Sequence, residues 1–165
     1  MTTTVITSQN PQTQLFETLE KLLQACNWRE ASLETETILT KAAGRENLQQ
    51  VTDVAEFPVK VLQTIDKLWV NYSQGRFGFS PQQRIYRNLG GKKEYEESSW
   101  KTFCEKICWR KNNTYVPFEQ MQFNLAAPVG HFPAISSLGT NSQPCTVCGG
   151  ECVQLRCIIS TIDFQ

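Results

Sequence analysis

The sequence predicts an all-α protein. Apolar residues recur at helical spacing along most of the chain, helix start and stop signals separate them, and no convincing run of alternating polar and apolar residues occurs before Leu138. A chain of 165 residues with 40% hydrophobic residues has the size of one domain with an ordinary core. We therefore expect a compact helical domain over residues 14–138, after a disordered lead over 1–13 and before a cysteine-rich tail over 139–165.

Three helices are predicted in the first half of the domain. An apolar face that runs from Leu15 to Cys26 predicts the first helix. Asn27 caps the second helix, with Glu30 three places on as its reciprocal partner, and the two helices are expected to pack as an antiparallel hairpin. The third helix opens at Pro58, because proline at a first helical position loses no hydrogen bond.

Two further helices and an irregular segment are predicted in the second half. Ser80-Pro81 is a helix start signal, and Ser98 or Ser99 caps the helix that follows. Prolines and a glycine within residues 124–133 forbid a regular helix there. Residues 153–164 are rich in Val and Ile and are expected to form a short strand or to dock as an extended segment.

Charge and composition exclude several classes of function. Lys and Arg number 16, as do Asp and Glu, so the electrostatic attraction that drives nonspecific nucleic-acid binding has no source. No stretch approaches the roughly 18 to 20 apolar residues that span a bilayer. The start of the chain lacks the basic flank and apolar run of a secretory signal. Because there is 1 histidine and no paired carboxylates beside a nucleophile, we expect no enzyme.

Three blocks of sequence carry a resemblance to a known family. They are residues 57–58 (FP), residues 64–80, which end in GRFGFS, and residues 123–133 (FNLAAPVGHFP). Together they resemble the "genomes uncoupled" family of tetrapyrrole-binding regulators of magnesium chelatase, over roughly residues 15–134. The resemblance implies an all-helical domain shaped like a cupped hand. Its irregular loops would form a shallow hydrophobic palm for protoporphyrin IX or its magnesium complex.

The resemblance also implies a partner and a cellular setting. Family members stimulate magnesium chelatase in chlorophyll synthesis, and we expect contact with its large porphyrin-binding subunit. Plastid members carry a transit peptide and this sequence shows none, so we expect a cyanobacterial cytoplasmic protein, held at most peripherally at the thylakoid membrane by its partners. Departures from the family pattern, such as Cys104 and Cys108, leave heme or an open-chain bilin as alternative ligands.

A porphyrin is a flat apolar disc with carboxylates on one edge, so its receptor needs a hydrophobic concave surface and cations at the edge of that surface. Apolar candidates in or beside the irregular segments are Phe77, Phe79, Trp109, Phe123, Leu125, Val129 and Phe132. The candidate cations, each able to pair with a carboxylate, are Arg76, Arg84, Arg87 and Arg110. Arginine suits this role because its planar guanidinium can bind a carboxylate through two hydrogen bonds.

Several of these residues have a second interpretation. Phe77 and Phe79 equally suit core plugs beneath a turn. His131 is a candidate axial ligand for bound magnesium, but within Gly-His-Phe-Pro a hydrogen bond to the backbone that holds the loop is the favoured role. Asp66 and Arg76 suit a structural ion pair with no ligand role.

The tail contains a cysteine cluster with three interpretations. Cys145 and Cys148 form a C-x-x-C pair, followed by Cys152 and Cys157, so four sulfurs are available for zinc or an iron–sulfur cluster. Structural zinc usually takes two tight pairs, and the second pair here is spread out, which disfavours zinc. A redox or bilin-linking thiol is the second interpretation, and an unstructured tail is the favoured one. The 7 cysteines, an odd number, indicate a reducing compartment rather than a disulfide framework.

The aromatic loops also allow a function of another class. A helical protein-interaction module would use the first hairpin and these loops to bind a protein, with the palm vestigial or filled by side chains. Porphyrin titration separates the two functions, because quenching of tryptophan fluorescence at micromolar porphyrin is expected only of a tetrapyrrole-binding protein.

Overall fold

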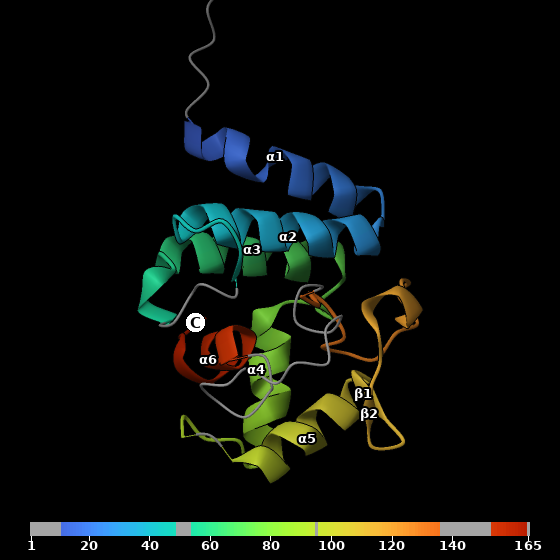
Figure 1. Cartoon of the computed structure of the whole chain (residues 1–165). Coiled ribbons are helices and arrows are strands. Elements are labelled where there is room, and N and C mark those ends of the chain that lie inside the picture. The colour runs from blue at the N-terminus through green and yellow to red at the C-terminus, as the bar shows by residue number, and fades with distance from the viewer. Residues whose placement is uncertain (1–10, 49–53, 95, 136–152, 165) are drawn as a thin grey trace, which may run out of the picture.

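The computed structural model describes residues 11–48, 54–94, 96–135 and 153–164, and over these ranges the chain is mainly helical (Figure 1). This confirms the predicted all-α class. The α-helices are α1 (Pro11–Gln24), α2 (Trp28–Ala42), α3 (Val59–Tyr72), α4 (Phe79–Asn88), α5 (Glu97–Lys106) and α6 (Val153–Thr161). The shorter elements are the 3-10 turns η2 (Val54–Glu56) and η3 (Phe118–Gln120) and the antiparallel strands β1 (Arg110–Lys111) and β2 (Thr114–Tyr115).

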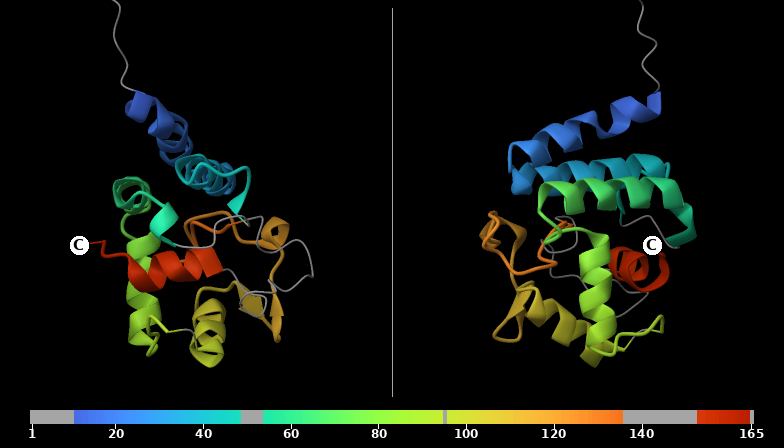
Figure 2. Two further views of the ribbon diagram at one scale, coloured as in Figure 1. Left: turned by 60° about the vertical axis from the view of Figure 1, so that its left-hand side comes forward. Right: turned by 180° about the vertical axis from the view of Figure 1, so that it is seen from behind.

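The helices form two groups. Helices α1, α2 and α3 pack against one another at one end of the molecule, with α1 and α2 forming the predicted hairpin (Figure 1). Helix α4 leads away from this group to α5 and the β1–β2 hairpin, and α6 lies beside α4 in every view (Figure 2). None of the described helices is long and apolar enough to cross a membrane.

An aromatic cluster joins the two groups of helices. Trp28 and Trp69, from α2 and α3, have ring centroids 6.0 Å apart, and both contact the ring of Phe77. Phe132 stacks on Trp69 at 6.1 Å. The indole Nε1 of Trp69 donates to Thr35 Oγ1 at 2.9 Å, so its buried polar atom is satisfied. This cluster fixes the position of the α3–α4 turn and of the irregular segment after η3.

A side chain of α3 caps the start of helix α4. Ser80 was expected to cap it, but the helix begins at Phe79, with Gly78 at the N-cap position. The backbone amide of Ser80 donates to Asp66 Oδ1 at 2.8 Å. A Cβ on Gly78 would lie 2.7 Å from the same oxygen, and its φ of +137° favours glycine. Asp66 therefore caps α4, and the expected Asp66–Arg76 ion pair is wrong.

Two other predicted caps had different outcomes. Asn27 Oδ1 accepts from the backbone amide of Glu30 at 3.5 Å, which confirms the side-chain cap of α2. At α5 the prediction was wrong, because Glu96 occupies the N-cap position. The hydroxyls of Ser98 and Ser99 donate to the Glu96 carboxylate at 2.9 and 2.8 Å.

The C-terminal segment is a helix, so the predicted strand or extended segment is wrong. Its apolar side chains pack against the domain at helical spacing, with the buried residues Ile158, Ile159 and Ile162. Gln83 of α4 donates through Nε2 to the carbonyl oxygens of Ile159 and Ile162, at 2.8 and 2.5 Å. The ring of Phe164 lies 5.8 Å from that of Phe79. Residues 153–164 therefore pack against α4.

Candidate functional site

The irregular segment 122–133 is anchored to α4 and to the turn before it. The backbone amide of Gly130 donates to the carbonyl oxygen of Arg76 at 2.8 Å. The Arg76 guanidinium donates to the carbonyl oxygen of Ala127 at 2.8 Å. Gln82, which is buried in α4, donates to the carbonyl oxygen of Gly130 at 3.0 Å. These bonds satisfy the backbone of an irregular segment that packs on the core.

Gly130 allows this segment to approach α4 closely. Its φ is +81°, and a Cβ at this position would lie 2.8 Å from Ile85 Cδ1 and 3.2 Å from Ile107 Cγ2. Only glycine combines the positive φ with this contact.

Most of the predicted palm aromatics lie in the core. Phe77, Phe79 and Phe132 have no exposed surface, and Trp109 is also buried. Phe77 and Phe132 meet edge to face with ring centroids 5.2 Å apart. The core-plug interpretation therefore describes Phe77 and Phe79 in this structure. In this structure these aromatics do not lie on an open surface, because the segment after Gly75 packs against Trp28 of α2 and Trp69 of α3.

Three predicted apolar residues of the same segment remain at least partly accessible, namely Phe123, Leu125 and Val129, which we call the apolar rim. Phe123 and Leu125 are half-buried, and Val129 is 40% exposed. The Phe123 ring stacks on Phe132 at 5.4 Å with an interplanar angle of 16°. The apolar rim is thus carried on a rigid aromatic base.

His131 holds the segment to the end of α5. Its Nδ1 donates to the carbonyl oxygen of Ile107 at 2.5 Å, as favoured from the sequence, and its own carbonyl oxygen accepts from Trp109 Nε1 at 2.7 Å. The ring is 1% exposed, and Nε2 has no hydrogen-bond partner among the described residues. Burial lowers the pKa of His131, and the hydrogen bond to Ile107 acts in the opposite direction. In this buried position the ring is closed to a metal bound at the surface.

Acidification is expected to destabilise the protein through His131. Its folded pKa lies below the ordinary value of 6.5, so between these values the unfolded chain binds more protons and the free energy of unfolding falls as the pH drops. Urea unfolding at steps from about pH 7.5 to pH 5 measures this loss. The His131→Gln variant should lose less stability over this range, and an unchanged slope would refute the assignment. Burial raises the pKa of Asp66, so Asp66 contributes with the opposite sign and equally in both proteins.

The predicted arginines occupy different places. Arg110 is held in the β1–β2 hairpin, where Nη1 pairs with Glu105 Oε1 at 2.5 Å and Nη2 donates to the carbonyl oxygen of Asn113 at 3.1 Å. Arg84 projects from the exposed face of α4 and makes no ion pair within the described ranges. The structure therefore does not bring Arg84 and Arg110 together at one carboxylate site.

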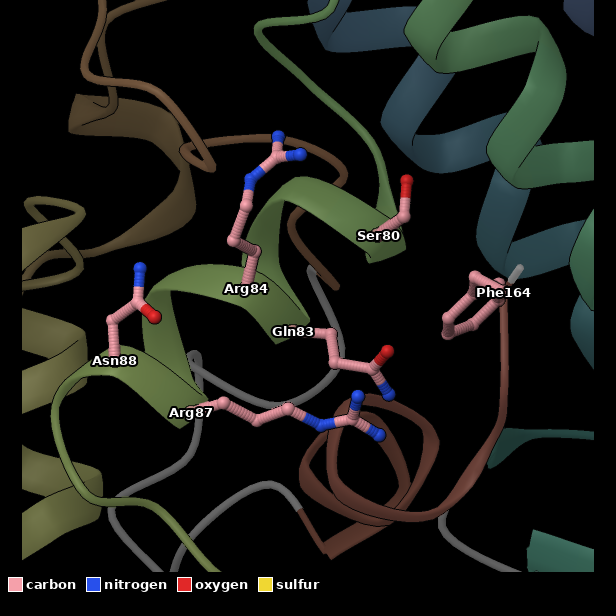
Figure 3. Close-up of a pocket in the computed structure, with 6 residues that line it drawn as sticks. All are labelled: Ser80, Gln83, Arg84, Arg87, Asn88 and Phe164. Atoms are coloured by element: carbon pink, nitrogen blue, oxygen red, sulfur yellow. The ribbon is translucent and has the colours of Figure 1, made fainter.

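A cavity of about 400 Å³ opens between α4 and the C-terminal segment (Figure 3). Its lining residues are Ser80, Gln83, Arg84, Arg87, Asn88 and Phe164. Of these, Arg84 and Arg87 were predicted from the sequence as cations for a carboxylate. The helical spacing of Ser80, Arg84 and Arg87 is a signal that could have grouped them on one face. Phe164 was missed because its segment was expected to be extended.

The cysteine cluster is only partly described. Cys145, Cys148 and Cys152 lie outside the described residues, and Cys157 is half-buried on α6. In the described part of the chain, no group of three or more His, Cys, Asp or Glu side chains is placed to hold a metal ion.

The motifs that form the anchored segment and the aromatic cluster are matched by a known family. A family model described as GUN4-like matches residues 9–145. The chain belongs to the GUN4-like family. This confirms the resemblance that the sequence motifs predicted, and it covers the anchored segment together with α1 to α5.

Relatives of this GUN4-like chain come from several organisms. The ycf53 protein of Cyanidium caldarium is 36% identical over 129 residues, which cover 74% of this chain and 52% of that protein. The chloroplastic tetrapyrrole-binding protein of Arabidopsis thaliana is 30% identical over 148 residues, which cover 81% of this chain and 53% of that protein. The chain therefore spans about half the length of these relatives.

Solved structures share the GUN4-like fold. The ligand-free structure of Arabidopsis thaliana GUN4 superposes with a TM-score of 0.68 at 27% identity and covers 99% of each chain. GUN4 from Chlamydomonas reinhardtii superposes with a TM-score of 0.65 at 23% identity, a likeness that shows the fold alone.

Proposed function

We propose that this GUN4-like chain is a non-enzymatic tetrapyrrole-binding protein that activates magnesium chelatase in chlorophyll synthesis. The observation that carries the proposal is family membership over residues 9–145, together with the Arabidopsis thaliana relative that is named for tetrapyrrole binding. The preferred ligands are protoporphyrin IX and its magnesium complex. The large porphyrin-binding subunit of the chelatase is the proposed partner.

The apolar rim supports this proposal as the surface for the macrocycle. The half-buried Phe123 ring continues the stack formed with Phe132 at 5.4 Å, so a flat ring system laid on it extends an existing stack. Such stacking contributes about 0.5–1.5 kcal/mol beyond burial itself. Leu125 and Val129 are on the same anchored segment and add apolar area. Burial of these side chains supplies most of the affinity, because each buried CH₂ group contributes about 0.8 kcal/mol.

The buried aromatic residues support the site from below. Phe77, Phe132 and Trp69 fix the position of the segment that carries the apolar rim. A rigid receptor binds a flat ligand without a further ordering cost, which favours affinity. His131 acts through its hydrogen bond to Ile107 and not as a ligand of the metal.

Titration with porphyrin tests the proposed function. Protoporphyrin IX, its magnesium complex, heme and biliverdin are each added to the whole chain, and tryptophan fluorescence is followed. We expect saturable quenching with a dissociation constant on the order of 1 µM or tighter for at least one porphyrin, which corresponds to about −8 kcal/mol. Preference for heme or biliverdin would favour the alternative ligands that the departures from the family pattern left open. Absence of saturable binding by all four ligands would exclude a tetrapyrrole-binding role.

A protein-interaction module is the second candidate, and one observation favours it. Phe77, Phe79 and Phe132 are sealed in the core, as expected if the chain's own side chains fill the palm. The same titration separates the two candidates, because an interaction module would leave tryptophan fluorescence unchanged.

A further inference from the structure

The cavity between α4 and the C-terminal segment has the features of a ligand site. Ser80, Arg84 and Arg87 are spaced four and then three residues apart, so they lie on one face of α4. Figure 3 shows both guanidinium groups projecting from the helix, with the Phe164 ring facing α4 from the C-terminal segment. The cavity therefore combines two planar cations with an aromatic wall.

The two guanidinium groups are available to a ligand. Neither Arg84 nor Arg87 forms an ion pair with any carboxylate in the described ranges. Burial raises the pKa of Asp66, and the positive charge of Arg84 partly opposes this rise. Asp66 Oδ1 accepts from the Ser80 amide at 2.8 Å and forms no ion pair with Arg84. A guanidinium favours a planar carboxylate, which it can bind through parallel hydrogen bonds.

The far wall of the cavity is fixed by contacts to α3 and α4. Phe164 packs on Phe79 at 5.8 Å, and the Gln63 amide donates to the carbonyl oxygen of Asp163 at 3.3 Å. Gln83 is buried and binds the carbonyl oxygens at the end of α6. The aromatic wall is thus positioned by the fold and does not depend on a ligand to hold it.

We propose that this cavity binds a carboxylate attached to an apolar group. Arg87, which extends toward α6 in Figure 3, holds the carboxylate oxygens, while Arg84 and the Asn88 amide add positive charge and a polar group on the other side of the cavity. The apolar part of the ligand lies on Phe164. The site is separate from the apolar rim, because the segment that carries the rim contacts α4 through Gln82 and Ile85, which point away from Arg84 around the helix.

Such a carboxylate has two possible sources, a propionate of a tetrapyrrole that binds at this cavity instead of on the apolar rim, or a separate small organic acid. The first test uses the whole chain and 3-phenylpropanoate, with its neutral amide as the matched control ligand. We expect the acid to shift the NMR signals of the Arg84 and Arg87 side chains with a dissociation constant on the order of 1 mM. Its amide should shift them far less. Arg87→Gln should weaken acid binding by about threefold to tenfold, as for a partly exposed ion pair.

The second test alone rests on the proposed function. Affinities for protoporphyrin IX and its neutral dimethyl ester are compared in the original chain, in Arg84→Gln and in Arg87→Gln. Lys106→Gln, which removes an exposed charge from the end of α5 away from the cavity, is the control. If the propionates bind here, both cavity variants weaken protoporphyrin by about threefold to tenfold and leave the ester unchanged.

The outcomes separate the two proposals. Loss of acid binding in the cavity variants with unchanged porphyrin affinities supports a small-acid site. If both cavity variants bind protoporphyrin IX more weakly but bind its dimethyl ester with unchanged affinity, the tetrapyrrole is the source of the carboxylate. The carboxylate site is overturned if the acid shifts the signals of neither arginine and the cavity variants bind both porphyrins as the original chain does. It is also overturned if Lys106→Gln weakens binding as much as the cavity variants do. If no porphyrin binds the original chain, the proposed function fails while the acid titration still tests the cavity.

Discussion

Replacing Phe77 with alanine is expected to lower the free energy of unfolding by about 3–5 kcal/mol. The ring has no exposed surface and meets Trp28, Trp69 and Phe132 with ring centroids 5.2–6.5 Å apart. Its removal leaves a void that the surrounding helices cannot close fully, because interiors are packed at crystal-like density. Equilibrium urea unfolding measures the loss.

Phe123→Ala is the matched control for this prediction. Its ring belongs to the same stack but is half-buried, so its removal should cost less than that of Phe77. If Phe77→Ala fails to fold, Phe77→Leu keeps most of the volume and should still lower the free energy of unfolding, by about 1 kcal/mol. A Phe77→Ala variant that unfolds like the original chain but has lost porphyrin binding would show that Phe77 contacts the ligand at the surface.

Replacing Val129 with aspartate is expected to weaken porphyrin binding by about thirtyfold to a thousandfold. The side chain is 40% exposed on the segment that carries the apolar rim. The change removes apolar contact with the macrocycle, worth on the order of 1 kcal/mol, and forces the ligand to desolvate a carboxylate, which costs a further 1–3 kcal/mol, roughly. Because Val129 is exposed, stability should change little. Fluorescence titration with protoporphyrin IX gives the affinity.

Val59→Asp provides the control for a new surface carboxylate. Val59 is 48% exposed at the first position of α3, outside the anchored segment, and its replacement introduces the same charge. Porphyrin affinity should be unchanged in this variant. Equal weakening by Val59→Asp and Val129→Asp would mean that net charge, and not the apolar rim, controls binding.

Helices with apolar residues at regular helical spacing were predictable from the sequence, but the residues that cap their first turns were harder to predict. The α2 cap at Asn27 is local, since donor and acceptor are separated by three residues, and it was predicted. The cap of α4 comes from Asp66, 14 residues away, and only the folded chain brings the two together. For α6, the Val and Ile content favoured a strand, but burial of one helical face on α4 overrode that propensity.

The candidate site was predictable as a segment but not residue by residue. The prolines and Gly130 identified 124–133 as irregular, and the structure anchors this segment on α4. Sequence cannot tell which of its aromatics face inward, because no periodicity exists in an irregular segment. Phe132 lies in the core, whereas Phe123, nine residues earlier in the chain, is half-buried. The arginine-lined cavity needed α6 in place, which the sequence did not predict.

Ring-current shifts in NMR spectra of the whole chain provide the most direct examination of where the macrocycle lies. A porphyrin strongly shifts protons within a few ångströms of its face, so spectra recorded with and without protoporphyrin IX locate it. We expect the largest shifts at the side chains of Phe123, Leu125 and Val129, with the signals of buried Phe77 less affected. Shifts that leave those three side chains unmoved while porphyrin is bound would contradict it.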